Sequence, residues 1–118
     1  MAAVDDSLRR ALLALHKAVL AAEREHLEQV HGVLSSVAFL QIVSDPVRYG
    51  WLQPLSRLIL AYEEDDEERA PEDELLARTR DLLLPPKEKT PFGRRYLSLM
   101  QREPALVLAH AELAKLLR

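Results

Sequence analysis

Residues 4–43 read VDDSLRRALLALHKAVLAAEREHLEQVHGVLSSVAFLQIV, and this stretch decides the fold class. Apolar residues recur in it at alternating steps of four and three, which is the spacing of one face of an α-helix. The members of this apolar stripe are Leu8, Leu12, Leu15, Val19, Ala22, Val30, Val33, Val37 and Leu40. A parallel row of leucines at positions 13, 20, 27 and 34 widens the apolar face.

The stripe keeps its phase across Gly32, so the periodicity predicts one helix from about residue 4 to residue 43, about 60 Å long. A break near Gly32 or at Ser35-Ser36 is the alternative, because Gly costs about 1 kcal/mol inside a helix. Ser44-Asp45-Pro46 ends the helix. A helix of this length extends past the other segments, and its apolar face then needs cover from a second copy or another protein.

The rest of the chain predicts shorter helices whose limits are marked by prolines. One begins at Pro46, with Asp45 or Ser44 as its cap, and Pro54 kinks or restarts it. The next begins at Pro71 and stops before Pro85-Pro86. The last begins at Thr90-Pro91, and Pro104 either kinks it or separates two helices.

No strand pattern and no internal repeat occur in the sequence. We therefore expect a single helical domain over residues 1–118. The predicted fold class is all-α, an antiparallel four- or five-helix bundle with a long N-terminal helix.

Composition limits the classes of protein that need to be considered. The 118 residues contain no Cys, which excludes disulfides, thiolate catalysis and Cys-ligated zinc. Asp5 and Asp6 stand where a signal peptide would be basic, and no apolar run is long enough to cross a membrane, so we expect a cytoplasmic protein without membrane contact. Arg outnumbers Lys and Ala and Leu are abundant, which suggests a GC-rich, bacterial genome.

Charge is unevenly distributed along the chain. Residues 63–86 carry ten acids and three bases, whereas residues 87–118 carry seven bases and three acids. Nucleic-acid binding is not expected, because the net charge is −3 and no compact helix-turn-helix connection is present. The bases, which include Lys87, Lys89, Arg94, Arg95 and Arg102, are expected to pair with the acids of residues 63–74, within or between protomers.

Glu23 and His26 form a Glu-x-x-His motif, which places a carboxylate and an imidazole on one helix face, as in di-iron bundles. His26 lies at the centre of the apolar stripe, with Glu23 to one side of it. The second copy, Glu28 and His31, lies away from the stripe and is expected on solvated surface. Residues 46–118 contain no further copy, so a metal site at Glu23 and His26 would need dimer symmetry. The alternative is a core histidine paired with Glu23 or a carbonyl.

Two further groups of residues are candidates for a site. His16 and His110 lie at similar heights in an up-and-down bundle, which predicts a buried polar pair that titrates near neutral pH. Arg48, Tyr49 and Trp51 are residue types favoured at binding surfaces, so this segment is a candidate interface or pocket.

No nucleophile elbow and no glycine-rich phosphate loop occurs in the sequence, so we expect no catalytic activity and no cofactor. The sequence thus predicts a small helical protein–protein interaction or regulatory module, as a homodimer, with a possible protein partner. A metal- or small-ligand-binding bundle that uses Glu23 and His26 is the first alternative, and a nucleic-acid-binding regulator is the second.

Overall fold

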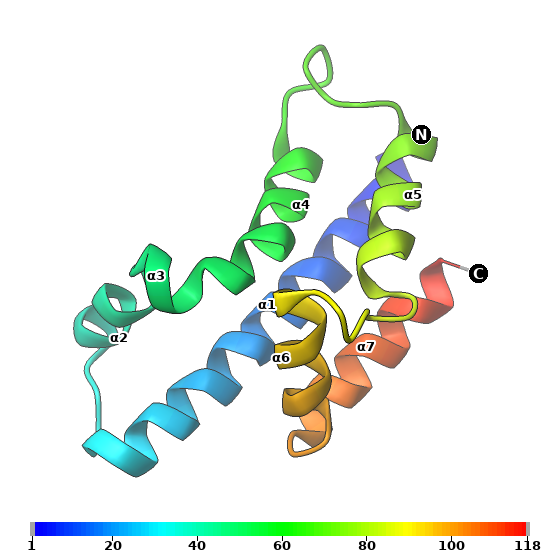
Figure 1. Ribbon diagram of the computed structural model, residues 1–118. Helices are drawn as coiled ribbons and strands as arrows, with labels where there is room; N and C mark the ends of the chain where they lie inside the picture. Colours follow the sequence, from blue (N-terminus) through cyan, green and yellow to red (C-terminus); the bar gives the residue numbers. More distant parts are fainter. Residues whose placement is uncertain (1, 118) are drawn as a thin grey trace.

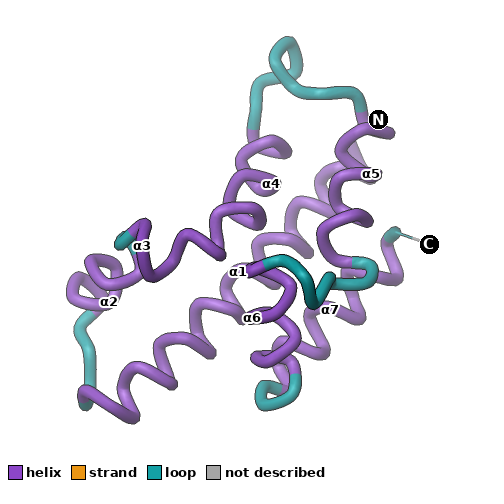
Figure 2. Tube along the Cα trace, in the orientation of Figure 1, coloured by secondary structure: helices purple, strands orange, loops and turns teal. Residues whose placement is uncertain are grey.

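The computed structural model describes residues 2–117, with the side chains of residues 6–117, and every regular element in that range is helical (Figures 1 and 2). The all-α prediction and the long N-terminal helix are therefore confirmed. The α-helices are α1 (Ala2–His31), α2 (Ser36–Val43), α3 (Pro46–Tyr49), α4 (Gln53–Glu63), α5 (Glu72–Leu83), α6 (Pro91–Met100) and α7 (Pro104–Leu116), and a 3-10 turn, η1 (Gly50–Leu52), joins α3 to α4.

The prediction of one helix through residue 43 is wrong, and the alternative, a break at Gly32, is confirmed. Gly32 has a φ of +81°, in the left-handed region that ends helices and favours glycine. Its N–H donates to the Glu28 carbonyl at 2.8 Å. Leu34 then contacts α1 through both of its backbone groups, because its N–H donates to Glu28 Oε2 and its carbonyl accepts from Arg24. The chain therefore turns away from the axis of α1.

Glu28 thus has a structural role that the sequence pattern did not predict. Its carboxylate is half-buried, accepts the Leu34 N–H at 2.8 Å and lies 3.5 Å from Arg24, whereas His31 is exposed as expected. After this turn, Ser35 caps α2 by accepting the Ala38 N–H at 3.1 Å.

The main core lies between α1, α4, α5, α6 and α7. The first part of the predicted stripe faces this core, with Leu8, Leu12, Leu15, Val19 and Ala22 all buried. α7 packs along α1 more extensively than any other helix does, and α4 and α6 also contact α1. The longest dimension of the molecule is 45 Å, which is the length expected of a 30-residue helix.

The second part of the stripe does not enter the core. Val30, Val33, Val37 and Leu40 are 68%, 94%, 66% and 58% exposed. The physical reason is the break at Gly32, which leaves these residues at the end of α1, in the connection to α2 and on α2 itself, away from α5 and α7 (Figure 1). A small second cluster joins α2 and α3 to α1 at this end of the molecule. Its buried members among the described residues are Leu27, Phe39 and Tyr49.

Prolines mark the starts of α3, α4, α6 and α7, as the sequence predicts. Asp45 caps α3 by accepting the Val47 N–H at 3.0 Å, and Pro54 lies in the first turn of α4, so the helix restarts there. Thr90 caps α6 by accepting the Gly93 N–H at 2.9 Å. Pro104 begins α7 as a separate helix. The chain therefore has more and shorter helical elements than the four or five predicted.

Candidate functional site

The residues that the sequence placed in two separate groups meet at one site. Glu23 and His26 of α1, Arg48 and Tyr49 of α3, and Trp51 of η1 line one hollow of about 410 Å³. Leu27 and Arg95 complete its lining. Two backbone features make this possible, because the break at Gly32 reverses the chain and the short α3 and η1 return it to the side of α1.

Glu23 is the buried charge of this site. Its side chain is 2% exposed, and its Oε2 accepts a hydrogen bond from Arg95 Nη2 at 2.7 Å. A buried carboxylate without a partner would be strongly unfavourable, and the guanidinium compensates it. Sequence reasoning did not identify Arg95 as its partner, because Arg95 is 72 residues away and lies on α6. The sequence did contain one indication of this pairing. An acidic residue beside an apolar stripe is expected to be partly buried, and it then needs a cation from another helix.

The two predicted roles on α1 are exchanged in the structure. The sequence placed His26 at the centre of the apolar stripe, but Glu23 is the buried residue and His26 is half-buried. Core packing on α1 passes through Ala22 and Leu27 at this level, so the buried face has rotated away from His26. His26 makes no hydrogen bond or ion pair with the side chains that the structure describes.

The aromatic residues form one wall of the hollow. The rings of Tyr49 and Trp51 lie 6.1 Å apart, and the Arg95 guanidinium lies 5.8 Å from the centre of the Trp51 ring, within cation–π distance. Burial raises the pKa of the Tyr49 hydroxyl, and the charge and hydrogen bonding of Glu23 raise that pKa further. Tyr49 is therefore a neutral hydrogen-bonding group at all physiological pH values.

The chemistry of this site differs from that of a metal centre. Among residues 6–117, no group of three or more His, Cys, Asp and Glu side chains could hold a metal ion. Glu23, the one buried carboxylate among the described side chains, is already engaged by the positive charge of Arg95. A metal at Glu23 and His26 therefore stays a prediction that requires ligands from elsewhere.

His16 and His110 each have a hydroxyl partner of their own. His16 Nε2 lies 3.4 Å from Ser56 Oγ on α4, and His110 Nδ1 lies 2.7 Å from the Tyr96 hydroxyl on α6. Burial lowers the pKa of both histidines. These contacts join α1 to α4 and α6 to α7, and among the described residues no hydrogen bond joins His16 to His110, the pair that the sequence predicted.

The basic residues of the C-terminal part do not pair with the acidic run within the chain as far as the structure describes it. Arg95 pairs with Glu23, and Lys87 pairs with Asp81 at 3.4 Å. The acidic run instead contacts Arg9, which lies 3.3 Å from Glu63. The within-protomer form of the predicted pairing is wrong, because α6 lies against α1 and η1 rather than against the loop that follows α4.

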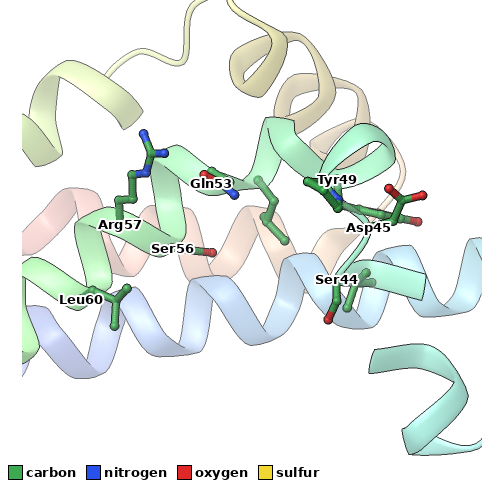
Figure 3. A pocket seen from close by; sticks show the side chains of 10 residues that line it. Ser44, Asp45, Tyr49, Gln53, Ser56, Arg57 and Leu60 are labelled. Carbon is green, nitrogen blue, oxygen red and sulfur yellow. The ribbon is translucent and has the colours of Figure 1, made fainter. Parts of the chain in front are cut away.

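A second hollow of about 440 Å³, shown in Figure 3, shares Tyr49 with the hollow at Glu23. It is formed by the end of α2 and by α3, η1 and α4. Two of its polar groups serve the local backbone, since Asp45 accepts the Val47 N–H and Ser44 Oγ donates to the Leu40 carbonyl at 2.7 Å. The hollow at Glu23 is the stronger candidate, because its polar side chains converge from three different elements.

Comparison of the chain with protein-family models, with curated proteins and with solved structures found no match. None of the helices in the described part of the chain has the length and apolar character needed to cross a membrane.

Proposed function

We propose that this chain is a non-catalytic helical interaction module that associates with a second copy of itself. The contact surface is the distal apolar patch, defined as Val30, Val33, Val37 and Leu40. One observation carries the proposal: these four large aliphatic side chains lie close together in the chain and are each more than half exposed. Clustered apolar exposure of this kind is typical of an interaction site, whereas single exposed apolar residues are common everywhere.

The composition around the distal apolar patch favours a second copy as the partner. Residues 32–43 contain no charged residue, in a chain in which 30% of residues are charged. A two-fold interface brings the same surface of both subunits together, so any charge in it meets its own like charge. A surface without charges avoids this repulsion and buries apolar area on both sides.

The oligomeric state tests the proposal. Native mass spectrometry and sedimentation at micromolar concentration are expected to show twice the chain mass of 13.4 kDa. Val37→Glu places a charge in the patch and should give a monomer, because both copies of the charge would be buried together. Leu108→Glu is the matched control, since Leu108 of α7 is 67% exposed and Val37 is 66% exposed. A wild-type monomer, or a Val37→Glu variant that still forms the dimer, would refute the proposal.

The same mass spectrum addresses the metal alternative, because a metal held by Glu23 and His26 adds mass that His26→Ala should remove. The remaining sequence predictions stay predictions: an antiparallel packing of the bundle, a cytoplasmic location, a bacterial origin and a further protein partner.

A further inference from the structure

The hollow at Glu23 is rich in hydrogen-bond donors that the protein itself does not use. Arg95 Nε is buried and has no hydrogen-bond partner. Arg48 and His26 make no hydrogen bond or ion pair with the described side chains, and neither does the Trp51 indole N–H. A buried donor without a partner, such as Arg95 Nε, is unusual, because most buried donors find a partner in the protein or in bound water.

The charge balance of the hollow favours a ligand with one negative charge. Its lining holds one carboxylate, Glu23, and two guanidinium groups, those of Arg48 and Arg95. Glu23 and Arg95 offset each other at 2.7 Å, which leaves the charge of Arg48 uncompensated. A monoanion matches this single free positive charge, whereas the second charge of a dianion would have no cation of the lining to pair with.

The other part of the lining is apolar. Leu27, Tyr49 and Trp51 contribute side chains to the wall, and the two aromatic rings are tilted by 41° to each other. The volume of about 410 Å³ is in the range of small-molecule sites. The hollow therefore combines donors and positive charge with an apolar surface that can cover the body of a small organic molecule.

We propose that this hollow is a binding site for a small organic carboxylate, held by Arg48 and its neighbouring donors, with its apolar body against Tyr49 and Trp51. Guanidinium groups bind carboxylates through charge-assisted hydrogen bonds, and the rings provide contact area. The lining of this site shares no residue with the distal apolar patch, so its test does not depend on whether the chain dimerises.

The only tryptophan of the chain, Trp51, lies in the hollow and reports on its occupancy. The probe is 3-phenylpropanoate, with the uncharged 3-phenylpropanamide and inorganic phosphate as comparisons. Trp51 fluorescence is expected to change saturably with the carboxylate. The amide should bind at least about tenfold more weakly, because it lacks the charge-assisted hydrogen bonds.

Arg48→Gln is the decisive variant, since Arg48 is exposed and its replacement should leave the fold intact. It should weaken carboxylate binding by about tenfold or more. Arg57→Gln is the matched control, because Arg57 is also an exposed arginine but lines the other hollow. Circular dichroism verifies that both variants are folded.

Four results would overturn the inference: no saturable change with the carboxylate, equal affinity for acid and amide, tighter binding of phosphate than of the carboxylate, or equal losses in Arg48→Gln and Arg57→Gln. The last of these would indicate a general effect of surface charge rather than a site.

Discussion

Replacing Arg95 by Gln is expected to cost more stability than replacing its partner Glu23 by Gln. The two side chains form one ion pair at 2.7 Å, but they are buried to different degrees: the Glu23 side chain is 2% exposed and the Arg95 side chain is 35% exposed. Each substitution removes the same ion pair, but Arg95→Gln leaves the carboxylate of Glu23 without its partner, whereas Glu23→Gln leaves the guanidinium of Arg95 without its partner. The difference between the two variants therefore measures the cost of an uncompensated charge in the interior.

The magnitudes follow from that difference in exposure. Arg95→Gln leaves the Glu23 carboxylate buried without a cation, which costs about 3–5 kcal/mol in comparable pairs. Glu23→Gln leaves a guanidinium that still reaches water and retains Trp51 beneath it, so the loss is nearer that of one charged hydrogen bond, about 1.5–3 kcal/mol. The double variant should be less destabilised than the sum of the two single variants, because no lone charge remains.

Urea unfolding followed by circular dichroism measures these free energies of unfolding. Glu112→Gln is the control, because Glu112 forms an ion pair with Lys115 in which both side chains are about two-thirds exposed. Such a pair contributes only about 0–1 kcal/mol.

Two results would refute the reasoning about Glu23. If Arg95→Gln cost no more than Glu112→Gln, the carboxylate would be reached by water and would not be a buried charge. If the effects of Glu23→Gln and Arg95→Gln added up in the double variant, the two groups would not be energetically coupled.

Further variants test other parts of the fold. Gly93→Ala should destabilise the protein by about 3 kcal/mol or more in thermal unfolding, because a Cβ there would lie 1.8 Å from the backbone carbonyl oxygen of Lys87. Gly50→Ala should be neutral or raise the melting temperature slightly, since the added Cβ meets no atom within 4 Å and the backbone is already helical; a large loss would contradict this packing. Because burial lowers the pKa of His16 and His110 below the ordinary value of 6.5, their neutral forms favour the folded state, and stability should fall as the pH drops below that value. A urea midpoint that does not change between about pH 7 and about pH 5, or that changes equally in a His16→Gln/His110→Gln variant, would show that these histidines are not responsible.

The local elements of this fold could be predicted from the sequence. Thr90-Pro91 and Asp45-Pro46 begin α6 and α3 as predicted, because a cap and a proline act on the first turn that follows them. The buried face of α1 up to Ala22 also agrees with the apolar spacing. Both signals depend on neighbours within a few residues, so they do not require knowledge of the rest of the fold.

The composition of the candidate site could be predicted only in part. The residue types of Arg48, Tyr49 and Trp51 and the spacing of Glu23 and His26 predict two candidate sites, and the structure places all five residues around one hollow. Their common location depends on the reversal of the chain after Gly32, which the apolar periodicity argued against. Periodicity shows which face of a helix is apolar, but it carries no information on whether the helix turns back.

The sequence by itself determined that the chain is helical, where most helices begin, and that the apolar stripe of α1 from Leu8 to Ala22 is buried. Only the tertiary structure decided that Arg95 neutralises Glu23, that the candidate residues share one hollow, and that Val30, Val33, Val37 and Leu40 are exposed. The physical reason is the separation along the chain of the residues that take part in each interaction. Capping, proline geometry and helical spacing act between near neighbours, whereas charge compensation and burial depend on segments that come together only after the chain has turned.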